Sequence, residues 1–309
     1  MSWQLKVFRV LLRHGVRRSL GRQRDSLSAR AWFERAAWVN ARGRPYQNFV
    51  ADQFETTGHD VPALWTAQPE RGAPFILYLH GGGYVMGNPR THAALAAFLA
   101  RKSGLPVCLP DYRLAPEHPF PAAFEDARAV WQALTARGHA PGAIALGGDS
   151  AGGGLALALL GALCAEDAPR PGCAFAFSPF TDLTVSGASI RENARSELLL
   201  PVERLFQLRD RVLAGADPAD PRVSPLFARF GGAPAVLIQN ARSEVLRDDA
   251  RRMVAHLRAQ GGQVTHQEWG NLPHVWQFFH AWMPEARAAL VQAAAFITAQ
   301  LPPRPASGS

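Results

Sequence analysis

A serine between glycines has the clearest capacity for chemistry in this 309-residue sequence. Ser150 lies in Gly148-Asp149-Ser150-Ala151-Gly152, which fits G-x-S-x-G and separates an apolar run, Ala143 to Leu146, from a helix-forming segment, Leu155 to Cys164. This order predicts a strand, a tight turn and a helix, with glycines relieving a collision and the serine held in strained backbone at the helix N-terminus. A hydroxyl is a poor nucleophile alone, so catalysis would require a base and an acid from elsewhere. The alternative is a glycine-rich turn whose serine only caps the helix.

A second glycine cluster offers hydrogen-bond donors. His80-Gly81-Gly82-Gly83-Tyr84 directly follows an apolar run, Phe75 to Leu79, that is typical of a buried strand. Glycines leave backbone N–H groups open to approach, which a developing oxyanion requires. We therefore assign the N–H groups of Gly82 and Gly83, with that of Ala151, as the donors of an oxyanion hole. Phosphate binding is the competing use of such a loop, but this one fits neither G-x-x-x-x-G-K-[ST] nor G-x-G-x-x-G.

Three motifs in a fixed order carry a resemblance to a known family. The His80 and Ser150 motifs flank a third, Asp111-Tyr112-Arg113-Leu114-Ala115-Pro116-Glu117-His118-Pro119-Phe120-Pro121. Together they resemble the hormone-sensitive-lipase family of α/β-hydrolases, specifically its bacterial carboxylesterases of the G-D-S-A-G type, from Phe75 to Leu301. The resemblance implies an α/β fold with a mostly parallel eight-stranded sheet, helices on both of its faces and a helical cap. It also implies a Ser–acid–His triad and small hydrophobic ester substrates.

The acid of such a triad follows the serine and precedes the histidine in the chain. The family places it at the first acidic position of a D-x-L-x-D pattern, just after the strand predicted at Ala235 to Gln239. That position is Glu244 in this sequence, where most relatives carry aspartate. Asp248 is the rival acid, but it stands where the N-cap of the following helix is expected.

Four of the ten histidines follow Glu244 and could act as the base. His256 falls in a predicted helix and His266 in a predicted strand, both common positions for structural histidines. His274 falls in a loop between the last strand and the last helix, which would let its imidazole reach the serine. The segment around it also resembles the family's Pro-His-x-[FW] pattern. His280 is expected to face the last helix, so His274 is the predicted base.

Other polar residues near these motifs are expected to be structural. His80 would brace the oxyanion loop by hydrogen bonds, and Asp149 would point away from the serine beside it. Arg113, Glu117 and His118 are expected to form a buried polar scaffold beneath the oxyanion loop.

The elements that must position these residues alternate from Pro74 onward, which predicts a parallel sheet. Strands are predicted at Phe75 to Leu79, Pro106 to Pro110, Ala143 to Leu146, Cys173 to Phe177, Ala235 to Gln239 and Gln263 to Trp269. Helices are predicted at Thr91 to Arg101, Pro121 to Ala136, Gly152 to Ala165, Asp248 to Gln260 and Glu285 to Gln300.

Before and within this pattern lie segments that do not alternate. Two helices (4–19 and 28–38) and an antiparallel pair (47–54 and 61–67, with Gly58 at the turn) are predicted first. A helical insertion interrupts the alternation after residue 180. We therefore predict N-terminal cap helices in 1–45, a catalytic domain in 46–180 and 215–301, a cap insertion in 181–214 and a flexible tail in 302–309.

The charge is concentrated at the N-terminus. Residues 1–30 contain eight basic side chains and one acidic one, so they carry +7 of the net charge of +8. Such a leader could bind anionic lipid or nucleic acid or serve as a transit peptide, but we favour solvated faces of amphipathic helices, with no nucleic-acid partner.

Arg9 and Arg13 interrupt the apolar run at 7–12, which argues against a secretory signal. No window is apolar enough to span a membrane, and the three cysteines lie in apolar runs without ligand spacing, so a soluble, cytoplasmic protein without stable membrane insertion is expected.

The substrate is the least constrained prediction. We expect short acyl chains, because the family's cap closes a compact pocket and no long amphipathic lid is evident. Residues expected to line that pocket are Trp32, Phe33, Tyr84, Val85, Leu198, Phe206 and Val275. Lactones and acetylated small molecules would suit the same machinery, whereas a receptor-like binding protein is disfavoured by the complete triad. No metal, nucleotide or organic cofactor is required, and a homodimer through the last strand of the sheet, with His266 and Glu268 on its edge, is a further expectation.

Overall fold

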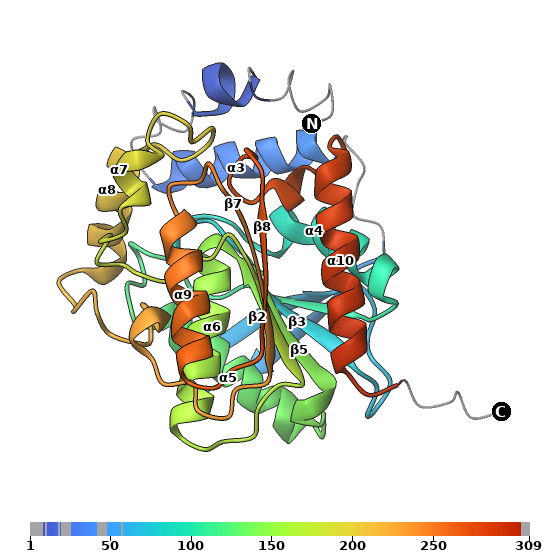
Figure 1. Cartoon of the computed structure of the whole chain (residues 1–309). Coiled ribbons are helices and arrows are strands. Elements are labelled where there is room, and N and C mark those ends of the chain that lie inside the picture. The colour runs from blue at the N-terminus through green and yellow to red at the C-terminus, as the bar shows by residue number, and fades with distance from the viewer. Residues whose placement is uncertain are drawn as a thin grey trace.

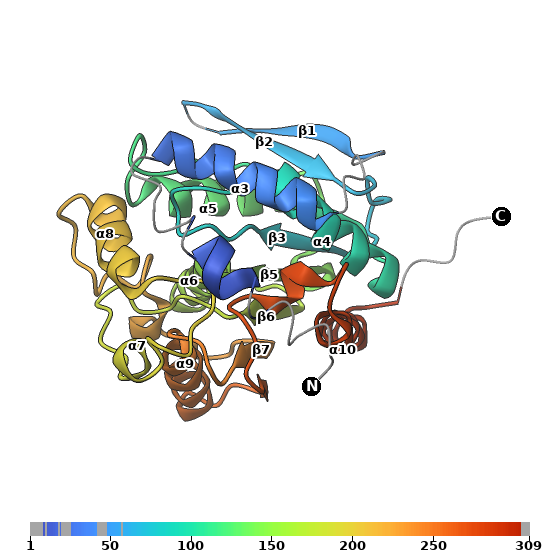
Figure 2. The ribbon, with the colours of Figure 1, turned by 90° about the horizontal axis from the view of Figure 1, so that it is seen from above.

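A twisted sheet with two helical layers organises the molecule, as Figures 1 and 2 show for the computed structural model. The structure describes residues 9, 11–17, 19, 26–41, 48–56 and 58–303. In this part the sheet has eight strands in the order β1-β2-β4-β3-β5-β6-β7-β8. They are β1 (Val50–Glu55), β2 (Asp60–Trp65), β3 (Phe75–Leu79), β4 (Val107–Pro110), β5 (Ile144–Asp149), β6 (Cys173–Phe177), β7 (Ala235–Ala241) and β8 (Val264–Trp269). β1 and β2 are antiparallel to each other, β2 is antiparallel to β4, and the remaining neighbours are parallel.

Helices cover both faces of the sheet (Figure 1). One face carries α4 (Pro89–Ser103) and α10 (Pro284–Gln300), and the other carries α5 (Ala122–Ala136), α6 (Ser150–Ala165) and α9 (Arg247–Ala259). At one end of the sheet lie α3 (Ser26–Asn40), α7 (Ser189–Glu192) and α8 (Val202–Leu213). Among the described residues, the short elements are a π-helix, η1 (Leu12–Val16), and three 3-10 turns, η2 (Pro141–Ala143), η3 (Pro225–Phe227) and η4 (Trp276–Phe279).

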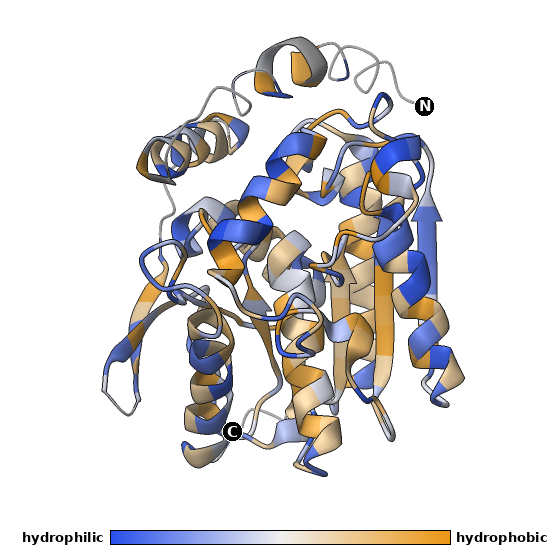
Figure 3. Cartoon of the chain, turned by 90° about the vertical axis from the view of Figure 1, so that its left-hand side faces the viewer, coloured by the Kyte–Doolittle hydropathy of each residue, from blue (hydrophilic) through white to orange (hydrophobic). Residues whose placement is uncertain are grey.

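The core lies in two layers because the central strands are buried on both faces. Phe75, Leu77 and Leu79 of β3 belong to one apolar cluster, whereas Ile76 and Tyr78 belong to the cluster on the opposite face. This division follows from the alternation of side chains along a strand, and continuous apolar strands are typical of parallel sheets covered by helices. Orange, hydrophobic strands are visible among the helices in Figure 3.

Most of the predicted elements are present. The parallel alternation and the hairpin around Gly58 are confirmed, and β3 and β6 have the predicted bounds. The strand before Ser150 is longer than predicted, because Gly147 and Gly148 continue its pairing with β6. The structure explains the first of these glycines, because a Cβ on Gly147 would overlap the Phe175 ring. The first predicted helix is described only in part, and its residues 4–8 lie outside the described residues.

Candidate active site

Ser150 occupies the turn between β5 and α6, as the sequence predicts. Its φ of +52° lies in the left-handed region, which confirms the strained backbone. A Cβ on Gly148 or Gly152 would overlap the carbonyl oxygen of Leu79, so both positions require glycine. The N-cap position of α6 is Asp149, and the Ser150 hydroxyl makes a different contact. The interpretation of Ser150 as only a helix cap is therefore wrong.

That contact is with His274, in the loop between β8 and η4. His274 Nε2 lies 2.9 Å from Ser150 Oγ, and its Nδ1 lies 2.8 Å from Glu244 Oε2. With Nδ1–H donating to the carboxylate, the lone pair of Nε2 faces the serine hydroxyl. The structure thus brings together the three side chains predicted as a triad, from segments as far apart as residues 150 and 274.

The carboxylate determines the electrostatics of His274. Burial alone would lower the pKa of this imidazole, but the hydrogen bond and negative charge of Glu244 outweigh burial, so the pKa of His274 is raised above its ordinary value. Glu244 is fully buried, and such a charge requires partners. Its Oε1 accepts hydrogen bonds from the N–H of Ala241 at 2.6 Å and from the hydroxyl of Ser178 at 2.9 Å. One oxygen therefore anchors the side chain while the other meets the imidazole.

Ser178 is a site residue that the sequence reasoning missed. It follows β6 directly, has a φ of +46°, and is fully buried. Besides donating to Glu244, its hydroxyl accepts the N–H of Val275, at 3.2 Å, from the residue after His274. Its position was a usable signal, because polar residues at the carboxyl ends of parallel strands meet at one edge of the sheet.

The predicted oxyanion donors lie in the loop after β3 and at the start of α6. Among the described residues, no acceptor is assigned to the N–H groups of Gly82, Gly83 and Ala151. The N–H of Gly81, in contrast, donates to Asp149 Oδ1 at 3.0 Å, and the same oxygen accepts the Tyr78 hydroxyl at 2.8 Å. Asp149 therefore fixes the loop from below, in keeping with its expected structural position.

His80 also lies beneath the loop. It is fully buried, its Nδ1 lies 3.0 Å from the carbonyl oxygen of Gly81, and its ring stacks on Tyr112 at a centroid distance of 4.2 Å. Burial and the neighbouring His92 lower the pKa of His80 to about 3. The side chain is therefore neutral at physiological pH, which fits a bracing contact better than proton transfer.

The structure corrects two expectations about charged residues. Asp248 is not the N-cap of α9. The N-cap position is Leu246, and the Asp248 carboxylate accepts the N–H of Ser189 at the start of α7, so its contact is with α7 and not with His274. The second error concerns the predicted buried scaffold of Arg113, Glu117 and His118. Glu117 and His118 are exposed, and Glu117 pairs with Arg30 of α3, whereas Arg113, which is partly buried, pairs with the buried Asp126 of α5.

The remaining candidate bases have other partners. His256 Nε2 lies 2.8 Å from the carbonyl oxygen of Ala228, His266 Nε2 lies 2.7 Å from Asn240 Oδ1, and the His280 ring packs against Phe98 of α4.

The predicted pocket residues lie in different surroundings. Tyr84, Val85, Leu198 and Val275 are buried, Trp32 and Phe33 are partly buried, and Phe206 is 39% exposed. Phe33 stacks on Phe278 at a centroid distance of 5.7 Å, and Phe278 packs against one of the core clusters. The sequence reasoning missed Leu208, on the same helix as Phe206. A Cβ on Gly83 would overlap Leu208 Cδ1, so α8 packs directly on the oxyanion loop.

The N-terminal helix α3 is joined to the same loop. Arg30 Nε donates to the carbonyl oxygen of Val85 at 2.9 Å, and its Nη2 donates to that of Ala115 at 3.1 Å. Glu34 accepts a hydrogen bond from Asn88 Nδ2 at 2.7 Å. The end of the loop and the start of α4 are therefore held from above by α3 (Figure 2).

In the part of the chain that the structure describes, no group of three or more His, Cys, Asp or Glu side chains is arranged to hold a metal ion. Nor does any helix of that part have the length and hydrophobicity needed to cross a bilayer. Cys108, Cys164 and Cys173 are buried free thiols.

Comparison with known proteins places these observations in a family. A profile of the α/β-hydrolase fold matches residues 76–278. A crystal structure of an esterase from the bacterial hormone-sensitive-lipase family superposes with a TM-score of 0.87 at 35% identity, covering 98% of this chain and 99% of that one. The chain belongs to the hormone-sensitive-lipase family of α/β-hydrolases.

Other known proteins are similar along most of the chain. An acetyl-hydrolase of Streptomyces hygroscopicus is 41% identical over 242 residues, which are 78% of this chain and 81% of the relative. An esterase of Acinetobacter venetianus is 37% identical, over 72% of this chain and 74% of its own length. The esterase EstE5, in a crystal soaked with p-nitrophenyl butyrate, has a TM-score of 0.87 at 34% identity, covering 97% of this chain and 99% of that one. By family, this chain is a carboxylic ester hydrolase.

Proposed function

We propose that this enzyme hydrolyses short-chain acyl esters with Ser150 as nucleophile, His274 as general base and Glu244 as the acid that orients the base. The observation that carries the proposal is the unbroken path from Ser150 Oγ through His274 to Glu244 Oε2, with contacts of 2.9 and 2.8 Å. These distances lie within hydrogen-bond reach, as nucleophile activation requires.

The reaction follows from this geometry. His274 Nε2 takes the hydroxyl proton as Ser150 Oγ attacks the ester carbonyl carbon, and Glu244 stabilises the imidazolium. The resulting oxyanion is stabilised by the N–H groups of Gly82, Gly83 and Ala151, each contributing about 3 kcal/mol. His274 then protonates the departing alcohol, leaving an acyl group on Ser150. Water activated by His274 attacks this acyl-enzyme, and the carboxylic acid and the free serine are released.

Two lines of support favour short acyl chains. The similar protein from Streptomyces hygroscopicus is named an acetyl-hydrolase, and EstE5 was soaked with a four-carbon acyl ester. In this chain, Leu208 packs on Gly83 beside two of the proposed donors, which limits the space there. The acetyl-hydrolase name equally supports removal of acetyl groups from small molecules, and lactones would enter the same mechanism.

The test is hydrolysis of p-nitrophenyl acetate, butyrate and laurate by the wild type and by Ser150→Ala. We expect activity on acetate and butyrate and its loss in the variant, to a residual rate of at most about one part in 10⁴ to 10⁶. A fluorophosphonate probe should label the wild type and leave the variant unlabelled, which would exclude a receptor-like binding role. Preference for laurate would contradict the short-chain proposal, and an active Ser150→Ala would contradict the nucleophile.

We also propose the division of the cap into residues 1–45 and 181–214, and pairing of two copies through β8. β8 is one of the two edge strands of the sheet within the described residues, and an edge strand presents unpaired backbone groups to a second copy. His266 and Glu268 lie on this strand but are already bonded, to Asn240 and Arg251.

A further inference from the structure

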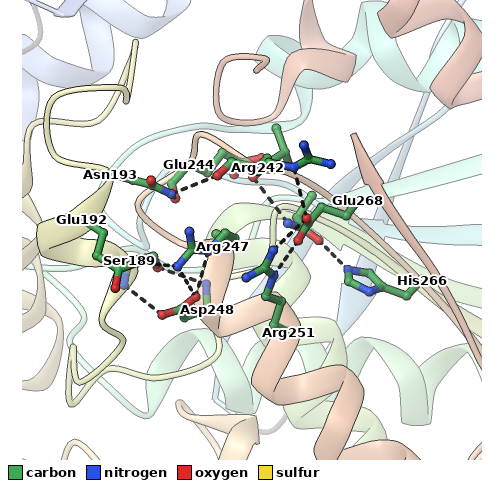
Figure 4. Close-up of polar contacts among 12 residues, drawn as sticks. Ser189, Glu192, Asn193, Arg242, Glu244, Arg247, Asp248, Arg251, His266 and Glu268 are labelled. Atoms are coloured by element: carbon green, nitrogen blue, oxygen red, sulfur yellow. Dashed lines mark hydrogen bonds and ion pairs between the residues drawn. The ribbon is translucent and has the colours of Figure 1, made fainter. Parts of the chain in front are cut away.

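The loop that carries Glu244 is bonded to a distant part of the chain. We call residues 242–246 the acid loop and residues 189–197 the cap segment. Asn193 Nδ2 donates to the carbonyl oxygens of Arg242, at 3.0 Å, and Glu244, at 2.6 Å. Figure 4 shows Asn193 pointing at this loop from the cap side. One side chain of the cap segment therefore fixes two peptide units around Glu244.

A buried carboxylate makes the next connection. Glu197 is only 1% exposed, and its Oε2 accepts the N–H of Val245 at 3.1 Å. Its Oε1 accepts the N–H of Leu199 at 2.8 Å, within the connection that leads to α8. Glu197 therefore joins the residue after Glu244 to the cap, and the mechanism above gives this carboxylate no part.

The cap segment also contacts the rest of the acid loop. Ser196 Oγ lies 3.1 Å from the carbonyl oxygen of Ser243, and Ser189 Oγ donates to that of Val245 at 2.6 Å. Each residue from 242 to 245 thus has a backbone group bonded to the cap segment. At the start of α9, Asp248 accepts the N–H of Ser189, as Figure 4 shows.

An N-terminal arginine binds the cap segment from its other side. Arg17, which directly follows η1, donates from Nη1 to the carbonyl oxygen of Glu197 at 2.9 Å and from Nη2 to that of Ala194 at 3.0 Å. The contacts form a series: Arg17 holds the cap segment, the cap segment holds the acid loop, and the acid loop carries Glu244.

We propose that the cap segment is the positioning element of the catalytic acid, with Asn193 and Glu197 as positioning residues. Arg17 is the contact that links this function to η1. The inference rests on the proposed role of Glu244. Glu244 reaches His274 correctly only when its backbone is fixed as well as its carboxylate. A displacement of about 1 Å in such a site can lower the rate by about 100-fold.

Charge supports the same assignment. The ionisable groups that face the Glu197 carboxylate are Glu244 and His274, and the Arg17 guanidinium lies at its backbone carbonyl. Burial, with the neighbouring Glu244 charge, raises the pKa of Glu197, whereas His274 opposes this rise. An ionised Glu197 would add to the field that favours the imidazolium form of His274.

The experiment separates the effect of the length of the Glu197 side chain from the effect of its charge. Glu197→Gln keeps the length of the side chain and removes its charge, whereas Glu197→Asp keeps the charge and shortens the side chain. Asn193→Ala removes the two bonds to the acid loop, and Arg17→Gln removes a contact one step away. Glu203→Gln, at an exposed carboxylate on α8, is the matched control. For each, kcat, KM, the pH profile of kcat/KM and Tm are measured with p-nitrophenyl butyrate.

We expect kcat to fall about 10- to 100-fold in Asn193→Ala and Glu197→Asp, with KM changed less than about threefold. Arg17→Gln should lower kcat by a smaller factor, about 3- to 10-fold, as expected for an indirect contact. Glu197→Gln should move the acidic limb of the pH profile of kcat/KM to lower pH, whereas Glu197→Asp should leave that limb in place. Glu203→Gln should behave as wild type.

The proposal is overturned if Asn193→Ala and Arg17→Gln retain the wild-type kcat. It is also overturned if the changes in kcat and KM only follow the fall in Tm from one variant to the next, because such changes would reflect lost stability. Should the Glu197 variants fail to fold, Asn193→Ala and Arg17→Gln alone decide the outcome. The proposed function is tested separately, because it fails if the wild type lacks esterase activity or Ser150→Ala retains it. If Ser150→Ala loses the esterase activity but the cap-segment variants keep the wild-type kcat, only this inference is overturned.

Discussion

Glu244 reaches His274 with a side chain one methylene longer than that of aspartate. The extra rotatable bond is compensated by the two hydrogen bonds to Oε1, from the Ala241 N–H and the Ser178 hydroxyl. Those bonds leave Oε2 for His274 alone, so the orientation of the imidazole depends on a carboxylate that has little freedom. The raised pKa of His274 is the electrostatic consequence of this arrangement.

This residue-scale argument predicts the effect of Glu244→Gln. The amide keeps the shape but removes the charge, so kcat should fall by about 10³- to 10⁴-fold, as for other triads that lose the acid's charge. Catalysis needs the neutral imidazole, so wild-type kcat/KM should rise with pH through a value above the ordinary histidine pKa of 6.5. In the variant that limb should move to lower pH, because the group that stabilised the charged imidazole is gone. The pH dependence of kcat/KM for both proteins checks this prediction, and Glu244→Asp, which keeps the charge, should shift the limb far less.

At the scale of elements, α8 contributes Leu208 to the oxyanion loop. Its Cδ1 occupies the space that a side chain at residue 83 would need. The helix also carries Phe206, which is exposed. Two residues of one helix, at positions 206 and 208, thus lie in different surroundings.

Leu208→Ala should enlarge the space beside Gly83 and relax the preference for short chains. We expect the ratio of kcat/KM for p-nitrophenyl hexanoate to that for acetate to rise about 10-fold, since a pocket discriminates by about 1 to 3 kcal/mol per methylene. Phe206→Ala is the comparison on the same helix. If that substitution, and not Leu208→Ala, changes the ratio, the role assigned to Leu208 is wrong.

The elements themselves were largely predictable from the sequence, because local patterns determine them. Apolar runs bounded by glycine or proline predict β3 and β6 correctly, and the motif around Ser150 predicts the turn into α6. The strand end at Asp149 was missed because consecutive glycines are typical of turns. Here Gly147 is required by the Phe175 ring of the neighbouring strand, a contact that the sequence does not display.

The supports of the site were harder to predict than its reactive groups. Ser150 and His274 stand in motifs, but Ser178, Asn193 and Glu197 act through backbone groups of the acid loop or of the loop that carries His274. Such contacts depend on how the segment after β6 folds back onto the acid loop, and no residue spacing encodes them. An acidic residue before three leucines, as at Glu197, was the available signal, because a charge among apolar residues requires buried partners.

At the scale of the whole molecule, burial of charge links distant parts of the fold and sets the pH dependence of stability. Asp249 of α9 is only 1% exposed, and its Oδ2 accepts the N–H groups of Thr181, at 2.9 Å, and Asp182, at 3.0 Å, from the segment after β6. Burial outweighs these two bonds, and the nearby Asp182 adds to its effect, so the pKa of Asp249 is raised to about 7.

The raised pKa makes the fold less stable as pH rises. Between the ordinary aspartate value of 3.8 and about 7, the folded protein holds a proton on Asp249 that the unfolded chain has lost. The free energy of unfolding therefore decreases as pH rises through this interval and becomes independent of this group above it.

In Asp249→Asn the amide oxygen can still accept both N–H groups, and nothing at the position titrates. Relative to the wild type, the variant should gain stability as pH rises from about 5 to about 8. Urea unfolding of both proteins at these two pH values measures the change, and any cost of the amide that is independent of pH cancels in the comparison. A difference between wild type and variant that is equal at both pH values would show that Asp249 does not carry this proton.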